Sequence, residues 1–284
     1  MTTTMIDPGS NTGLGAGPGA GWGADRLVGL AGKLWFATAL AGQWIFMAYI
    51  FAFYGVSTLT GRMQAWTRLD MVRMSYVRGD AAGNLVFAAH ALAAGLVALA
   101  GALQLMPWIR RRAPAVHRWT GRAYLIAVMA AALAGLYLVW IRGDRPSPVG
   151  ATSLSLNAVL MLVFAGRAWL LARRGETAAH RRWALRTYIV ANGQWFFRMG
   201  VIAWSLAWRG PVGIVDAAHG NLIYVMDFAC YLVPLAVLEF YLRPRRNRTA
   251  GLALAGGLGL AAVVTGMGVF GYAALLADIL PGRI

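Results

Sequence analysis

The sequence predicts an all-α protein, a polytopic transmembrane helix bundle of about seven spans. Of its 284 residues, 59% are hydrophobic and only 13% are charged, which gives more apolar surface than one soluble core can bury. Seven stretches reach the length of about 20 mainly apolar residues that a membrane-spanning helix needs. Their apolar residues do not alternate, which argues against a transmembrane β-barrel. We therefore expect the lipid bilayer to surround the chain.

The expected spans are joined by short connections that are charged or contain Gly and Pro. They cover residues 29–53, 84–107, 118–141, 151–172, 183–208, 221–242 and 250–277. We expect three parts: a flexible N-terminal tail over 1–25, a six-span membrane core over 26–242, and an additional C-terminal transmembrane helix within 243–284. The tail lacks the basic start of a signal peptide.

The formal net charge is +16, which would indicate a nucleic-acid partner in a soluble protein. Here the arginines lie in short loops between apolar spans, where they determine the membrane topology, so we expect no nucleic-acid partner. The arginines concentrate in three connections on one side of the predicted bundle, which we call the arginine-rich side. They are Arg110, Arg111, Arg112, Arg118 and Arg122; Arg173, Arg174, Arg181, Arg182 and Arg186; and Arg243, Arg245, Arg246 and Arg248. The positive-inside rule makes this side, and the N-terminus, cytoplasmic. Four arginines in the connection 55–83 weaken this bias without reversing it.

An internal repeat, Trp-x-x-Arg-x-Tyr, opens two predicted helices from the arginine-rich side. The copies are Trp119, Arg122 and Tyr124, and Trp183, Arg186 and Tyr188. Equivalent residues should lie at equal depth, which favours two helices related by parallel duplication. Anchoring at the membrane interface explains the Trp, Arg and Tyr residues. It does not explain why His117 and His180 precede the copies, and Glu239 is expected at the same boundary.

These motifs resemble the bacterial family of predicted membrane proteins catalogued as domain of unknown function 2306. The residues that carry the resemblance are His90, Gln104-Leu105, His117-Arg118-Trp119, Gly121-Arg122, Tyr124, His180-Arg181-Arg182-Trp183 and Arg186. The resemblance covers roughly residues 30–242 and leaves the last span outside. It implies a multi-pass protein of the bacterial cytoplasmic (inner) membrane, and it implies no activity.

Three ionisable residues are expected at one depth in the membrane. Arg198, Asp227 and His90 each lie roughly 8–9 Å below the boundary opposite the arginine-rich side, at the helical rise of about 1.5 Å per residue. Ionisable groups are costly at this depth and are candidates for function. We expect a buried ion pair between Arg198 and Asp227, with His90 and His219 nearby. The pair could belong to a functional site, or it could act only as a structural clamp between helices.

The four histidines lead to the first functional hypothesis, a membrane redox protein that holds b-type haem. His90 and His219 are expected on one side of the membrane, and His117 and His180 on the other, so each side has two imidazoles. Two axial histidines can hold a haem iron between helices. The layout is similar to that of transmembrane b-type cytochromes, although His219 is predicted in a loop. The single cysteine, Cys230, excludes a cysteine metal cluster.

Two other classes of function remain open. A proton-linked or anion transporter would use the group of His90, Arg198 and Asp227, and Gly193 and Pro234 are typical of the broken helices of transporters. A non-catalytic membrane scaffold or assembly factor would associate, also with its own copies, through the small-residue faces of its second and seventh spans. The sequence identifies no catalytic residue. The absence of Walker, zinc-protease and nucleophile-elbow motifs argues against a hydrolase.

Overall fold

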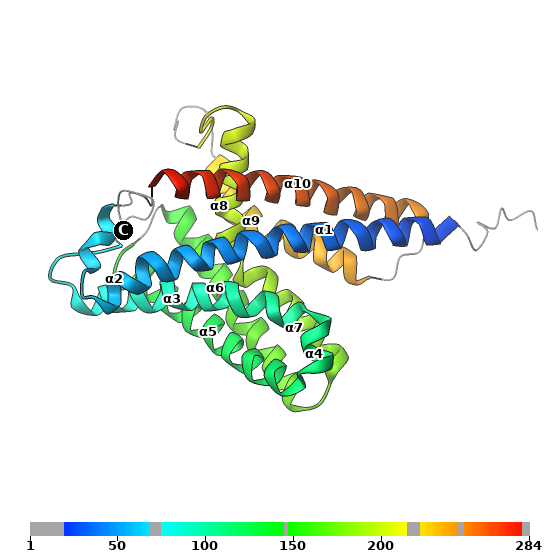
Figure 1. The fold of residues 1–284 in the computed structure, drawn as a ribbon, viewed down its shortest axis with the longest axis horizontal. Helices are drawn as coiled ribbons and strands as arrows, with labels where there is room; N and C mark the ends of the chain where they lie inside the picture. Colours follow the sequence, from blue (N-terminus) through cyan, green and yellow to red (C-terminus); the bar gives the residue numbers. More distant parts are fainter. Residues whose placement is uncertain (1–19, 69–74, 145–146, 215–221, 244–246, 280–284) are drawn as a thin grey trace, which may run out of the picture.

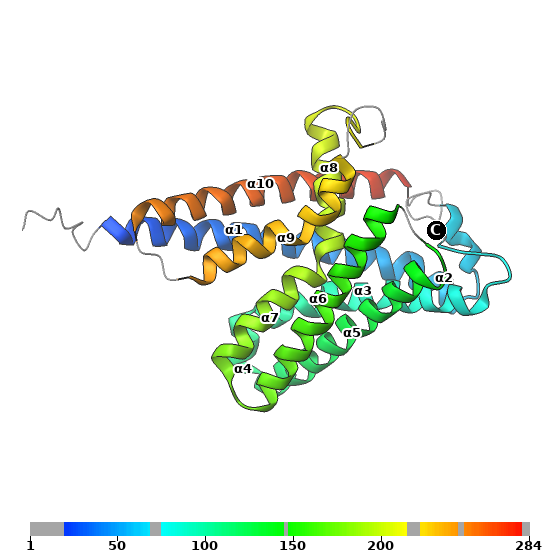
Figure 2. The same cartoon turned by 180° about the vertical axis from the view of Figure 1, so that it is seen from behind.

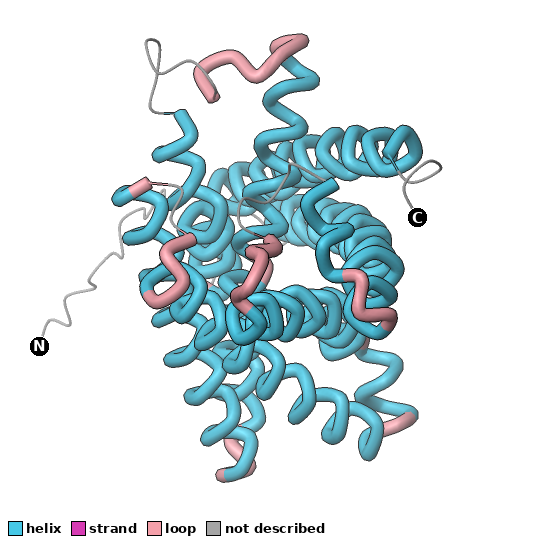
Figure 3. The backbone as a smooth tube through the Cα atoms, turned by 90° about the vertical axis from the view of Figure 1, so that its left-hand side faces the viewer, coloured by secondary structure: helices cyan, strands magenta, loops and turns pink. Residues whose placement is uncertain are grey.

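A computed structural model of the chain describes residues 20–68, 75–144, 147–214, 222–243 and 247–279 (Figure 1). Within these ranges the chain forms helices and loops without any strand (Figure 3), which confirms the all-α prediction. The long helices are α1 (Ala20–Tyr49), α3 (Ala81–Leu105), α5 (Pro114–Trp140), α6 (Pro148–Arg173), α9 (Leu222–Leu242) and α10 (Arg248–Ile279). The shorter elements are the π-helix η1 (Ile50–Gly55), α2 (Val56–Leu59), the 3-10 helix η2 (Met63–Arg68), α4 (Pro107–Arg112), α7 (Thr177–Ala191) and α8 (Gly193–Ala207).

Six of the described helices are long and apolar enough to cross a membrane, close to the seven spans predicted. The first of them combines α1, η1 and α2 into one element, Gly23–Leu59. The difference lies in the fifth predicted span, 183–208, which is divided into α7 and α8 of 15 residues each. Residues 20–25, expected in the flexible tail, belong to α1.

The division between α7 and α8 falls at Asn192, directly before Gly193. The Asn192 side chain donates a hydrogen bond from Nδ2 to the carbonyl oxygen of Tyr188, 2.8 Å away. Asparagine competes in this way for backbone groups, and glycine is a poor helix former, so both residues favour an interruption. Figure 2 shows the change of direction between the two helices. The break expected near Pro234 is absent, since α9 continues through this residue.

Helix starts follow local sequence signals. Proline occupies the first turn of α4, α5 and α6, where its missing N–H is not needed. The side chain of Asp80 caps α3 by accepting a hydrogen bond from the Gly83 N–H, and Ser147 caps α6 in the same way through Gly150. These signals fix where the chain enters each long helix.

The helices form two neighbouring groups. Helices α1 and α10 lie side by side (Figure 1), and α10 also packs against α8. In the second group α3 packs against α5, α5 against α6, and α6 against α7, while α3 also contacts α1. Gly251 of α10 allows close approach to Ala24 of α1. One residue of the small-residue face of α10 therefore packs against a helix of the same chain. Gly259 faces open space, and association of copies through this face stays a prediction.

A polar clamp joins α3 to the end of α5 on the side opposite the arginine-rich connections. Arg142 donates hydrogen bonds to Asp80 Oδ2 at 3.0 Å and to Asn84 Oδ1 at 2.6 Å. Asn84 in turn bonds both backbone groups of Val77. The Arg142 side chain is 3% exposed and that of Asp80 is 32% exposed. The clamp thus neutralises a buried guanidinium through a partly exposed carboxylate.

We predict that Asp80→Asn lowers the free energy of unfolding by about 2 kcal/mol, because it leaves the buried Arg142 guanidinium without a carboxylate. The double variant Asp80→Asn with Arg142→Met removes that charge and should lose less stability than the single variant. Equilibrium unfolding of the detergent-purified protein measures both. A double variant less stable than Asp80→Asn would contradict the clamp.

Candidate functional site

The two copies of the sequence repeat have the same Trp–Arg geometry. The guanidinium of Arg122 lies over the Trp119 ring at 4.9 Å, and that of Arg186 lies over the Trp183 ring at 4.9 Å. Both are cation–π contacts between residues three apart on a helix. Trp119 is 68% exposed, as an interfacial anchor requires, whereas Trp183 is partly buried and also contacts Arg167 at 5.4 Å.

Glu239 of α9 pairs with one copy of the repeat. Arg186 donates from Nε to Oε1 at 2.6 Å and from Nη2 to Oε2 at 2.8 Å, a bidentate pair that links α7 to α9. The sequence placed Glu239 at the same boundary as the repeat, and the structure brings it into contact with the second copy.

The tyrosines of the repeat converge on one glycine of α3. A Cβ on Gly101 would lie 2.9 Å from the Tyr124 ring and 3.3 Å from the Tyr188 ring. Tyr188 also forms a buried hydrogen bond with Gln43 of α1, whose Nε2 lies 2.8 Å from the hydroxyl. The Tyr124 hydroxyl has no hydrogen-bond partner among the described residues. The repeat therefore provides two buried tyrosines, only one of which has a polar partner.

The described histidines lie in two separate parts of the bundle, His117 with His180 in one and His90 in the other. His180 Nδ1 lies 2.8 Å from the Ala168 carbonyl oxygen, and His117 Nδ1 lies 3.0 Å from the amide nitrogen of Gln104 in the amide orientation that satisfies its neighbours. His117 and His180 are close enough to interact electrostatically. On α3, His90 Nδ1 lies 2.9 Å from the Ala131 carbonyl oxygen. His219, its predicted partner, lies outside the described residues.

The predicted ion pair between Arg198 and Asp227 is not formed. The two ion pairs of the described residues are Arg142 with Asp80 and Arg186 with Glu239. Arg198 Nη1 instead donates to the Gln194 carbonyl oxygen at 2.9 Å, and its guanidinium lies 5.8 Å from the Phe46 ring. The depth estimate did not fix the direction of either side chain. Arg198 points toward α1, whereas the backbone of Asp227 is held against α6, because its carbonyl oxygen accepts a hydrogen bond from the Ser153 hydroxyl.

Arg198 lies among aromatic side chains that the sequence analysis did not single out. We call this group the Arg198 cluster and define it as Arg198, Phe46, Tyr49, Tyr54 and Tyr272. Arg198 interacts electrostatically with all three tyrosines and with His90. Tyr272 is 1% exposed, and its hydroxyl has no partner among the described residues.

The π-helix η1 shapes the α1 side of this cluster. It begins directly after Tyr49 and carries Phe53 and Tyr54, and all three of these aromatic residues are buried. Tyr49 stacks on Phe53 with ring centroids 5.8 Å apart and meets Tyr272 of α10 at 6.2 Å. Short π-helical segments often occur at functional sites. The run of aromatic residues from 46 to 54 was the sequence signal, but it is equally typical of apolar packing.

Long apolar helices with polar contacts between them define the class of the chain, an integral multi-pass α-helical membrane protein. A family model described as "Predicted membrane protein (DUF2306)" matches residues 87–242, and the chain belongs to this family. The match extends from within α3 to the end of α9 and leaves α1 and α10 outside. No curated protein and no solved structure matches the chain.

We predict that Tyr188→Phe destabilises the protein by about 1–3 kcal/mol, because it leaves the fully buried Gln43 amide without its partner. Tyr124→Phe is the matched control, since it removes a hydroxyl that has no partner among the described residues. It should be close to neutral. Thermal or denaturant unfolding compares the two variants, and equal losses would contradict the assigned hydrogen bond.

Proposed function

We propose that the chain is a membrane transport protein that binds a small anion at the Arg198 cluster. The observation that carries the proposal is the guanidinium of Arg198, half-buried in the bundle and without a carboxylate partner among the described residues. A cation in such a setting is costly unless it is paired. A bound anion would supply the missing charge.

The donor groups around Arg198 support an anionic ligand. The hydroxyls of Tyr49 and Tyr54 are hydrogen-bonded to each other, so one proton of this pair and the proton of the Tyr272 hydroxyl remain to be donated to a ligand. That of Tyr272 has no other partner in the described part of the chain. The planar fork of a guanidinium matches the oxygen atoms of carboxylate and phosphate groups. We therefore assign the ligand to the small carboxylates or phosphate-like oxyanions.

The helix break supports transport in preference to fixed binding. Asn192 and Gly193 interrupt the span only a few residues before Arg198. Secondary transporters bind their substrates beside discontinuous helices of this kind, because such helices can reorient around the site. The π-helix η1 on the facing side gives the cluster a second irregular wall.

We predict that proteoliposomes containing the protein take up radiolabelled acetate or phosphate, and that Arg198→Gln lowers the initial rate at least tenfold. The exposed Arg181 at the arginine-rich side provides the control, since Arg181→Gln changes one charge without touching the cluster. Its uptake rate should match that of the unchanged protein. Uptake of both anions at the rate of protein-free vesicles would contradict transport.

A specific observation favours a second candidate function, membrane electron transfer through b-type haem. His117 and His180 interact electrostatically at the arginine-rich side, which supports a ligand site shared by the two imidazoles. A carbonyl beside Nδ1 of His180 favours the tautomer whose free Nε2 can bind a metal. His117 fits less well, because its Nδ1 accepts from the Gln104 amide and its Nε2 then carries the proton. Ligation there requires the amide to turn over.

The redox candidate predicts a sharp Soret band in the absorption spectrum of the detergent-purified protein, with a shift on reduction by dithionite. Replacing His117 and His180 together by alanine should abolish the band, whereas Arg198→Gln should leave it unchanged. A featureless spectrum from haem-replete cells would exclude bound haem and leave the anion site unaffected.

A further inference from the structure

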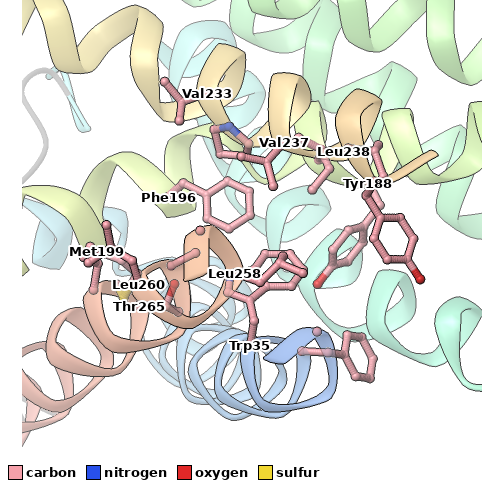
Figure 4. A pocket seen from close by; sticks show the side chains of 18 of the residues that line it. Trp35, Tyr188, Phe196, Met199, Val233, Val237, Leu238, Leu258, Leu260 and Thr265 are labelled. Atoms are coloured by element: carbon pink, nitrogen blue, oxygen red, sulfur yellow. The ribbon is translucent and has the colours of Figure 1, made fainter. Parts of the chain in front are cut away.

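An apolar groove of about 790 Å³ lies between α1, α7, α8, α9 and α10. Trp35 of α1 and Phe196 of α8 face each other in it, with stacked ring centroids 6.2 Å apart. Figure 4 shows these rings with Val233 and Leu258 around them. Its volume lies in the range of about 300–1,000 Å³ that is typical of small-molecule sites. None of the residues that define the Arg198 cluster lines the groove.

The groove is elongated and extends along α9. Tyr241 and Pro107 line it at the arginine-rich side, and Met226 lines it near the opposite end of α9. The fifteen helical steps from Met226 to Tyr241 correspond to about 22 Å of helix. This length covers more than half of a hydrocarbon core of about 30 Å. The shape therefore suits an extended apolar chain.

Only one of the lining residues is charged. Lys33, the single lysine of the sequence, lines the groove from α1, and its side chain is exposed. The remaining lining residues are apolar or uncharged, and no carboxylate is among them. The groove thus combines one cation, contributed by α1, with an apolar body. An amphiphile with an anionic head complements both parts.

We propose that the groove binds one membrane lipid with an anionic headgroup. The headgroup lies at Lys33, and an acyl chain extends past Trp35 and Phe196 toward Met226. A lipid suits this site better than a helix of another protein, because a helix with its side chains is about 10–12 Å across, whereas the Trp35 and Phe196 ring centroids in the groove lie only 6.2 Å apart.

The test is native mass spectrometry of the full chain released from nanodiscs of equal phosphatidylglycerol and phosphatidylcholine. We expect one phosphatidylglycerol retained per chain. Lys33→Gln should lower its retention relative to phosphatidylcholine about fivefold, the effect of one cation near an anionic lipid. Arg181→Gln, a charge change on the same side but outside the groove, should leave the ratio unchanged.

Variants at two neighbouring glycines distinguish loss of lipid binding in the groove from loss of the fold. Gly257 lines the groove and Gly256 does not, and both have open space where a side chain would begin. Gly257→Phe should displace the lipid, whereas Gly256→Phe should retain it. Equal retention of the two lipids by the unchanged protein, retention of a quinone instead, or equal behaviour of the two phenylalanine variants would overturn the proposal.

Discussion

The structure depends on one constraint: a polar side chain inside the bilayer must find its partner within the protein, because lipid offers none. Three contacts meet this constraint and also join the helices. Gln43 and Tyr188 connect α1 to α7, Arg186 and Glu239 connect α7 to α9, and the clamp of Arg142 connects α5 to α3. The histidine contacts with backbone carbonyls act in the same way. Arg198 departs from this pattern, because no carboxylate of the described residues neutralises it. The hydroxyls of Tyr124 and Tyr272 also depart from it, since neither has a hydrogen-bond partner among the described residues.

The break at Asn192 determines where that unpaired charge points. It separates α8 from α7, so α8 packs against α9 and α10 while α7 stays with α6. Arg198 consequently lies 5.8 Å from the Phe46 ring of α1 and interacts electrostatically with Tyr49 of α1 and Tyr272 of α10. The cluster is therefore assembled from a helix inside the family match and two helices outside it.

The sequence predicted the fold class and the repeat because both depend on local patterns. Apolar length identifies spans, and matched motifs give matched Trp–Arg geometry. The proposed pairing of Arg198 with Asp227 failed because residue counting gives depth along a helix but not the direction in which a side chain points. The Arg142–Asp80 clamp was missed because its two residues lie 62 positions apart, one directly before α3 and the other just after α5. Tyr49, Tyr54 and Tyr272 were missed because aromatic residues in a span are usually core.

The central claim is that an anion completes the charge of the Arg198 cluster. Anomalous diffraction from crystals grown in selenate tests it most directly, because selenium marks an oxyanion without altering the protein. We predict a selenium peak close enough for the selenate oxygens to accept hydrogen bonds from the Arg198 guanidinium and the Tyr272 hydroxyl, and its loss in crystals of Arg198→Gln. Peaks confined to the arginine-rich surface, with none beside Arg198, would contradict the account.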